Sequence, residues 1–194
     1  EISLGLVGSE MCIRDRTHPI LKGNITSIYQ DSEGELWIGS WEEGLHHVKT
    51  DGTIEIFEYD AKNPYSISSN FVRACCEDNL GNIWIGTFNG LNRYDKSTGL
   101  FQNHTASDAQ SDGLTHSSIW CIVKDNQGTL WLGTYFGGVN YFNPEYEIYS
   151  RYMYSPIEKK GLSNPVVGRT IEDKDGNLWI GTEGGGLNYY NRRT

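Results

Sequence analysis

The sequence predicts an all-β fold, and three observations support this. One motif, in which an acidic residue and a glycine share a turn and a tryptophan and Gly-Ser or Gly-Thr follow, occurs four times. Its copies start at Asp31, Asp78, Asp125 and Asp173. They recur every 47 or 48 residues, close to the roughly 40–45 residues of a four-stranded propeller blade. Short apolar runs alternate with turn residues inside each copy, and helical periodicity is absent. We therefore predict a β-propeller fragment of about four blades, each with four antiparallel strands, the last blade being incomplete.

The first strand of each unit ends at the motif aspartate. These strands are expected at Ile25–Gln30, Val72–Glu77, Ile119–Lys124 and Val167–Glu172. Each leads into Asp-x-x-Gly, where the aspartate can accept hydrogen bonds from nearby amides and the glycine can adopt the left-handed conformation.

The second strand carries the tryptophan. It is expected at Leu36–Ser40, Ile83–Thr87, Leu130–Thr134 and Leu178–Thr182. A glycine-rich turn leads to a third strand, such as Leu91–Tyr94 or Leu187–Tyr190. The fourth strand is an aromatic-rich run, expected at Ile54–Tyr59, Leu100–His104 and Ile148–Met153. The repeat units therefore lie at about 24–60, 71–105, 118–154 and 166–190 within a partial propeller of residues 17–194.

The repeated tryptophans and glycines are interpreted as framework residues. They are Trp37, Trp84, Trp131 and Trp179, with Gly39, Gly86, Gly133 and Gly181 two residues later. A ligand rarely needs four identical contacts, whereas stacked blades need one bulky side chain at each interface.

Residues 1–16, EISLGLVGSEMCIRDR, share nothing with the repeat. Residues 6–15 back-translate into a string that resembles the adaptor used to build sequencing libraries. We expect segment 1–16 to be a translated artefact and not native protein, with a natural disordered N-terminus as the alternative. It has no apolar run after a basic start, so it is not a signal peptide.

Composition argues against several classes of partner. With 16 basic and 25 acidic residues the net charge is -9, and no basic cluster is present; nucleic acid and anionic membranes are therefore not expected as partners. No run approaches the roughly 18 apolar residues of a membrane span. Cys75, Cys76 and Cys121 lack metal-site spacing and lie in strand-like segments, where small buried hydrophobes are expected.

The four D-x-x-G-x-[LI]-W-[IL]-G-[ST]-x-x-G units resemble the two-component regulator propeller repeat, over nearly all of residues 17–194. The resemblance implies the periplasmic sensor of a hybrid histidine kinase of the Bacteroidetes type, with two propellers of about seven blades before the membrane helix and kinase. It implies an oligosaccharide ligand, the remaining blades and kinase domains of a parent chain as partners, and a homodimer. Residues 17–194 hold no kinase, receiver or DNA-binding segment, so no catalytic residue is carried over. We expect a fragment of such a sensor, truncated at both ends.

Candidate ligand residues are those that break the repeat on one face of the propeller, because blade packing does not require them. In the turns between second and third strands these are Trp41, Phe88, the pair Tyr135–Phe136, and Glu183. Five residues before each motif aspartate, at the expected mouth of the central channel, stand Thr26, Arg73, Trp120 and Gly168. One residue further on stand Ser27, Ala74, Cys121 and Arg169.

These residue types suit a sugar ligand. Aromatic rings match the C–H faces of sugars, and arginine donates paired hydrogen bonds to carboxylates or sulfates. The sequence therefore predicts an oligosaccharide site, an acidic or sulfated ligand being favoured. Its residues are Trp41, Arg73, Phe88, Trp120, Tyr135, Phe136, Arg169 and Glu183. The alternative for each aromatic residue is packing on the next blade.

No catalytic, metal or cofactor site is predicted. The turn Asp173-Lys-Asp175-Gly-Asn177 resembles a calcium loop, but Gly184 stands where a bidentate glutamate is needed. The histidines at 46, 47, 104 and 116 lack metal-ligand spacing and are expected as surface or strand residues. A protein-interaction propeller is the second functional hypothesis. A propeller lyase or lactonase is a distant third, since the expected channel positions hold no metal ligands.

Overall fold

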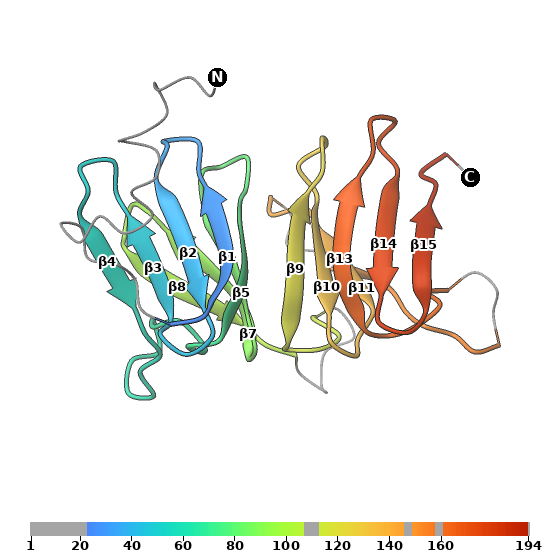
Figure 1. The fold of residues 1–194 in the computed structure, drawn as a ribbon, viewed down its shortest axis with the longest axis horizontal. Helices are drawn as coiled ribbons and strands as arrows, with labels where there is room; N and C mark the ends of the chain where they lie inside the picture. Colours follow the sequence, from blue (N-terminus) through green and yellow to red (C-terminus); the bar gives the residue numbers. More distant parts are fainter. Residues whose placement is uncertain (1–22, 107–112, 146–148, 158–160, 194) are drawn as a thin grey trace, which may run out of the picture.

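The computed structural model describes residues 23–106, 113–145, 149–157 and 161–193. In these residues the chain forms four antiparallel sheets, and each sheet is one blade (Figure 1). The expected artefact at 1–16 lies outside the described residues. No helix among the described residues is long and apolar enough to span a membrane.

Consecutive strands pair within each blade, so the strand order in a sheet is the order in the chain. Blade one contains β1 (Ile25–Gln30), β2 (Leu36–Ser40), β3 (Leu45–Val48) and β4 (Ile54–Phe57). Blade two contains β5 (Val72–Glu77), β6 (Ile83–Thr87), β7 (Gly90–Asp95) and β8 (Leu100–His104). Blade three contains β9 (Ile119–Lys124), β10 (Leu130–Thr134), β11 (Val139–Phe142) and β12 (Ser150–Tyr152). Blade four contains β13 (Val167–Glu172), β14 (Leu178–Thr182) and β15 (Gly186–Tyr190).

The all-β prediction is confirmed, and the first two strands of every blade match their expected bounds. The third strands start one residue early, because Gly90 and Gly186 already pair with the preceding strand. Strand β4 ends at Phe57, two residues before its expected end. The expected strand Ile148–Met153 begins outside the described residues, and β12 covers its middle.

The motif aspartate closes the turn after each first strand, as predicted. In blade one, Asp31 Oδ1 accepts hydrogen bonds from the amides of Glu33 and Glu35, and Gly34 adopts a φ of +85°. The other aspartate oxygen accepts a bond that the sequence did not suggest, from the indole N–H of Trp37 at 2.9 Å. The same bond joins Trp84 to Asp78, Trp131 to Asp125 and Trp179 to Asp173. Each tryptophan is thereby fixed by the turn that precedes it.

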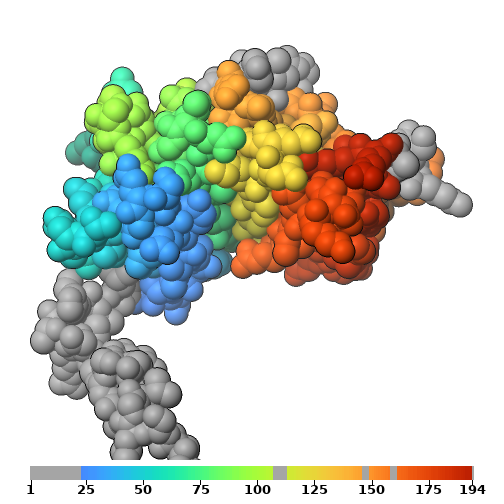
Figure 2. Space-filling view, turned by 90° about the horizontal axis from the view of Figure 1, so that it is seen from above, coloured from blue at the N-terminus to red at the C-terminus, as the bar shows by residue number. Residues whose placement is uncertain are grey.

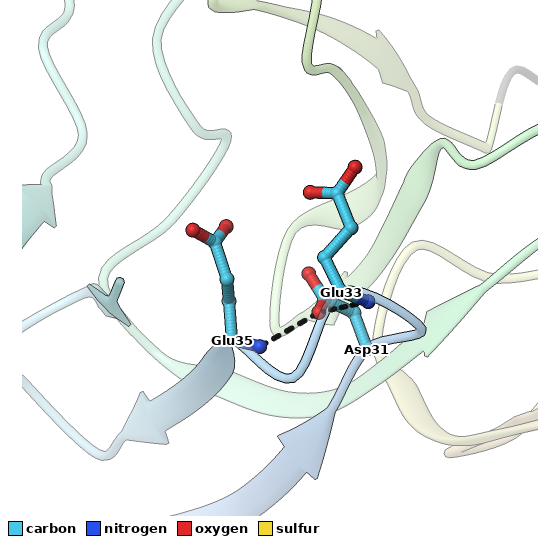
Figure 3. Close-up of side chains that lie close together, drawn as sticks. All are labelled: Asp31, Glu33 and Glu35. Carbon is cyan, nitrogen blue, oxygen red and sulfur yellow. Dashed lines mark hydrogen bonds between the residues drawn. The ribbon is translucent and has the colours of Figure 1, made fainter. Parts of the chain in front are cut away.

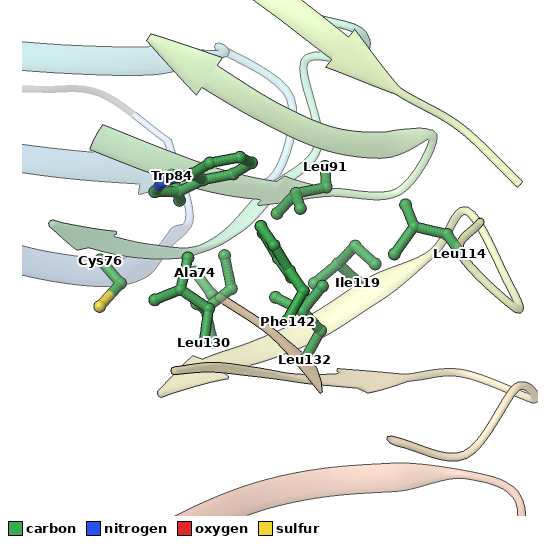
Figure 4. Close-up of a cluster of buried hydrophobic side chains, with 10 residues drawn as sticks. Ala74, Cys76, Trp84, Leu91, Leu114, Ile119, Leu130, Leu132 and Phe142 are labelled. Atoms are coloured by element: carbon green, nitrogen blue, oxygen red, sulfur yellow. The ribbon is translucent and has the colours of Figure 1, made fainter. Parts of the chain in front are cut away.

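Each blade packs its tryptophan face against the next blade, and the blades follow one another in sequence order (Figure 2). Between blades two and three, Trp84 and Leu91 meet Ile119, Leu130 and Phe142 (Figure 4). The Trp84 and Phe142 rings lie 5.0 Å apart, edge to face. The framework tryptophans Trp37, Trp84 and Trp131 are at most 3% exposed. Their predicted packing role is therefore present at three blade interfaces, or seams.

The framework glycines allow the blades to approach closely. A Cβ added at Gly86 would lie 2.7 Å from Ile119 Cγ2, and one at Gly133 would lie 2.6 Å from Val167 Cγ1. Gly39 faces Val72 of blade two in the same way. Gly181 has no such neighbour, and Trp179 is 38% exposed, because no described blade covers that face of blade four.

A repeated asparagine on the third strand holds the segment that enters each blade. Asn92 Oδ1 accepts the amide of Ser68, and Asn140 and Asn188 accept the amides of Thr115 and Ser163. The same position in blade one is His46, since it pairs with Ile38 as Asn92 pairs with Ile85.

Candidate ligand site at the channel mouth

The turns between second and third strands are held by one repeated backbone hydrogen bond. The amides of Trp41, Phe88, Tyr135 and Glu183 donate to the carbonyls of Asn24, Phe71, Ser118 and Val166. Each acceptor lies in the segment that enters the same blade. This bond places four non-repeating side chains at equivalent points, next to the starts of the first strands.

A register shift marks the start of every first strand. The pairing skips one residue between Ile25 and Ser27, and again at the equivalent points of the other three blades. The skipped residues are Thr26, Arg73, Trp120 and Gly168. A bulge of this kind redirects a side chain out of the regular strand alternation. The predicted channel-mouth positions are therefore bulge positions.

Arg73 lies among three aromatic rings from three blades. Its Cζ atom is 4.3 Å from the centre of the Trp120 ring, 5.3 Å from that of Trp41 and 5.5 Å from that of Phe88. These distances allow cation–π attraction. Burial lowers the pKa of Arg73 from its ordinary value, yet a guanidinium remains protonated in proteins. The cluster therefore holds a fixed positive charge.

Trp120 continues this cluster toward the turn of blade three. Its ring stacks on Tyr135 at 5.4 Å with an interplanar angle of 9°. Phe136 contacts Tyr135 edge to face at 4.3 Å. His116 lies 6.5 Å from Tyr135 and 6.3 Å from Phe136, which extends the aromatic surface.

Arg169 adds a second guanidinium from blade four. Its Nη1 donates to the backbone carbonyl of Trp120 at 3.4 Å. Arg73 and Arg169 both line a cavity of about 270 Å³ between the first strands, together with Thr26 and Thr170. The predicted convergence of the two guanidinium groups on one opening is thus present in the structure.

One predicted residue stands apart and three contributors were missed. Glu183 is exposed in its turn, and no described contact joins it to the other seven predicted residues. The centre of the Phe71 ring lies 5.5 Å from that of Trp41 and 6.1 Å from that of Phe88. Ser118 accepts a hydrogen bond from Arg73 Nη1 at 3.5 Å, and His116 borders Phe136. These three lie in the entering segments, where the sequence pattern alone gave no signal.

Three carboxylates gather at the other end of blade one, in the turn between β1 and β2. Asp31, Glu33 and Glu35 point toward one region and could each offer an oxygen to a cation (Figure 3). Lys96 Nζ lies 2.9 Å from both Asp31 Oδ2 and Glu33 Oε2, so an ammonium group from blade two already pairs with two of the three carboxylates. Asp173 in the calcium-like turn likewise accepts the amides of Asp175 and Asn177.

The three cysteine thiols of the first strands are unsuited to nucleophilic chemistry. Burial raises the pKa of the Cys75 thiol to about 12 and that of Cys76 to about 11. Burial also raises the pKa of Cys121. Such thiols remain protonated and behave as small hydrophobic side chains, as predicted. His46 and His47 lie in β3 and are buried, which agrees with the strand prediction and not with the surface prediction.

Sequence comparison places the four repeats in a known family. Residues 19–42, 66–89, 113–136 and 161–184 match the two component regulator propeller. No curated protein matches the chain.

Structure comparison finds the same fold in larger proteins. The extracellular domain assigned to the hybrid two component system BT3049 from B. thetaiotaomicron is 20% identical with a TM-score of 0.73, over 92% of this chain and 24% of that one. The corresponding domain of BT4673 from the same organism is 23% identical with a TM-score of 0.71, over 90% of this chain and 22% of that one. Virginiamycin B lyase from Staphylococcus aureus is 16% identical with a TM-score of 0.60, over 88% and 56% of the two chains.

The chain thus spans about a quarter of the length of the two hybrid-system domains. At these identities the structural likeness establishes the fold, and the four phased motif matches establish the family. The chain belongs to the two-component regulator propeller family.

Proposed function

We propose that this chain is the ligand-binding propeller segment of an extracytoplasmic, periplasmic sensor of a two-component system. The channel-mouth cluster, which is formed around Arg73 by Trp41, Phe88, Trp120, Tyr135, Phe136 and Arg169, binds an oligosaccharide. It binds an acidic or sulfated oligosaccharide more tightly than a neutral one. The segment itself performs no catalysis. The observation that carries this proposal is the position of the Arg73 guanidinium among the rings of Trp41, Phe88 and Trp120.

Arg73 has hydrogen-bonding capacity left for a ligand. A guanidinium carries five N–H donors, and the side chain makes one hydrogen bond in the described residues, to Ser118. Carboxylates and sulfates suit the remaining donors because arginine binds them with charge-assisted, bidentate geometry. The surrounding rings leave Arg73 half-buried, and the lower local dielectric strengthens such a contact.

The cluster also presents ring surface to solvent. Trp41 is 41% exposed, and Phe88 and Phe136 are each 55% exposed. Exposed aromatic rings beside hydrogen-bond donors are suited to the mixed apolar and polar faces of a sugar. Since the cluster draws on all four blades, a ligand there would contact several repeat units at once.

Family membership supports the sensor assignment. The two hybrid-system relatives are described as extracellular domains, and a kinase output would reside in other domains of a parent chain. The lyase shares the fold at 16% identity. The described residues contain one group of side chains close enough together to bind a metal ion, and it lies at the opposite end of the blade, where Lys96 already pairs with Asp31. We therefore rank sensing above protein interaction, and both above catalysis.

Screening against immobilised oligosaccharides tests the proposal. The panel contains neutral, carboxylated and sulfated glycans of matched length, and the full chain is compared with Arg73→Gln and Arg151→Gln. Arg151 is exposed on β12, away from the cluster, and controls for net charge. We expect binding of acidic glycans by the wild type and Arg151→Gln, and loss in Arg73→Gln. Equal loss in both variants, or binding unaffected by either, would contradict the assignment of the site.

A further inference from the structure

Two positively charged side chains from different blades meet at Trp120. The strands that carry them, β5 and β13, lie on either side of β9, which carries Trp120 (Figure 1). Arg73 Cζ lies 4.3 Å from the centre of the Trp120 ring, and Arg169 Nη1 donates to the Trp120 carbonyl at 3.4 Å. Both side chains line the cavity of about 270 Å³ between the first strands. Two guanidinium groups thus border one small space.

Neither guanidinium is balanced by a carboxylate. In the described part of the chain, Arg73 and Arg169 form no ion pair, and their hydrogen bonds go to a hydroxyl and a backbone carbonyl. Lys96 and Arg192 are also partly buried, and each of them pairs with a motif aspartate. The described residues that line the cavity include no aspartate or glutamate. Because a partly buried charge is costly without an opposite charge, the cavity favours an anion.

Two buried donors at the same point have no acceptor. Arg73 Nε and Trp120 Nε1 are both buried, and neither has a hydrogen-bond partner among the described residues. Buried polar atoms in folded proteins are nearly always paired, so two neighbouring exceptions indicate an acceptor that comes from outside the chain. Thr170 adds a hydroxyl to the cavity lining. It accepts the Cys121 thiol at 3.8 Å and can therefore donate its own proton.

The placement of these donors favours an anion with oxygens in several directions. A carboxylate has two coplanar oxygens, which a single guanidinium fork can satisfy. A phosphate group has three acceptor oxygens, and a sulfate group has the same tetrahedral shape. Here the donors come from blades two, three and four, so a tetrahedral group can accept from all of them at once. Small rotations of interface side chains, which are common on binding, would turn the two buried donors toward it.

We propose that Arg73, Trp120, Arg169 and Thr170 form an oxyanion site that binds a tetrahedral sulfate or phosphate group in preference to a carboxylate. The group is either a free inorganic ion or the ester group of a sugar. In the second case the inference rests on the proposed function, because the aromatic rings of the channel mouth then hold the sugar. Arg169 is the residue that distinguishes a tetrahedral group from a planar one.

Matched small probes test the preference. The sugars are galactose, galacturonate, galactose 6-sulfate and galactose 6-phosphate, which share one ring and differ at one position. Inorganic sulfate, inorganic phosphate and acetate form the second set. Calorimetry on the full chain at constant ionic strength should show both esters binding about tenfold or more tightly than galacturonate. Free ions that bind as tightly as the esters would identify an inorganic occupant, whereas esters that bind more tightly than the free ions would identify a sugar ester.

Three variants assign the preference to Arg169. Arg169→Gln should remove the advantage of the esters over galacturonate. Arg169→Lys keeps the charge without the planar fork and should restore part of that advantage. Arg151→Gln, an exposed change on β12, should leave every affinity unchanged.

Three outcomes would overturn the oxyanion site. They are equal binding of galacturonate and the esters, a preference that survives in Arg169→Gln, and no binding of any ester or inorganic oxyanion. Longer acidic glycans that still bind through Arg73, without preferring a tetrahedral group, would overturn this site and leave the proposed function intact. Failure of all acidic glycans to bind would refute both.

Discussion

The Cζ atom of Arg73 lies 4.3 Å from the centre of the Trp120 ring on the neighbouring blade. Both residues occupy the same bulge position of the repeat, which is threonine in blade one and glycine in blade four. The repeat fixes the place of these side chains and leaves their identity free. A propeller can thus keep its seams constant while its channel mouth changes.

The seams predict a clear difference between two framework tryptophans. Trp84→Ala should lower the free energy of unfolding by about 3–5 kcal/mol, the usual loss for a buried aromatic side chain. Trp179→Ala should cost much less, because Trp179 is 38% exposed whereas Trp84 is fully buried. Urea midpoints of the two variants check this. Similar losses would mean that burial at the seam is not what the repeated tryptophan provides.

The framework glycines allow a second matched comparison. Gly86→Ala should destabilise the chain by about 1–3 kcal/mol, because its Cβ would lie 2.7 Å from Ile119 and force the blades apart. Gly181→Ala should be tolerated, since the nearest atom to its Cβ is 3.6 Å away. Thermal unfolding followed by circular dichroism measures both. A well-tolerated Gly86→Ala would argue against close blade approach as the reason for this glycine.

Acid should weaken the seam between blades one and two. Burial by itself would raise the pKa of Asp31, but the hydrogen bonds from Trp37 and Lys96 outweigh it and lower the pKa below its ordinary value. The resulting stability is present above the unfolded pKa of about 3.9 and is lost as pH falls through the lower folded value. Lys96→Met should cost about 1–3 kcal/mol at neutral pH and flatten the acid limb of the stability curve. Urea titrations of the wild type and Lys96→Met, from neutral to acid pH, measure the free energy of unfolding. If both proteins lost the same stability in acid, this linkage would be wrong.

His46 predicts a second pH effect, at higher pH. Burial lowers the pKa of His46 from its ordinary value, and both of its buried ring nitrogens lack a hydrogen-bond partner among the described residues. The folded state therefore holds a neutral ring while the unfolded state takes up a proton below about pH 6.5. Stability should fall as pH drops below that value and level off below the folded pKa. His46→Asn, the residue of the other three blades, should remove this dependence, and a variant that retained it would assign the effect to other groups.

Much of the fold could be predicted from the sequence because the repeat encodes it. The first and second strands are bounded by an aspartate-glycine turn and a tryptophan-glycine pair, so the pattern located them to the residue. The fourth strands lack such markers. The expected end of β4 was wrong by two residues, and the expected start of β12 lies outside the described residues. The indole–aspartate hydrogen bond was missed because the sequence analysis assigned the aspartate to the turn and the tryptophan to blade packing, and so did not connect the two residues.

The candidate site was predicted from the positions at which the four repeats carry different residues. Counting back from the aspartate found Arg73 and Trp120, because a fixed period places equivalent residues at one end of the blades. Periodicity does not report contacts between different side chains, so the convergence of Phe71, His116 and Ser118 on this cluster could not be foreseen. Nor could it show that Glu183 stands apart from the cluster.

The affinity of the full chain for a matched pair of oligosaccharides, one carboxylated or sulfated and one neutral, tests the central claim most directly. Calorimetry should give tighter binding of the acidic member by the wild-type chain, and Arg73→Gln should reduce its affinity by about 10- to 100-fold, as expected for a lost charge-assisted hydrogen bond. The neutral member should lose far less. Trp120→Ala should weaken both, because the indole supports Arg73 and Tyr135. An unchanged ratio of the two affinities in Arg73→Gln would contradict the claim that this guanidinium reads the charge of the ligand.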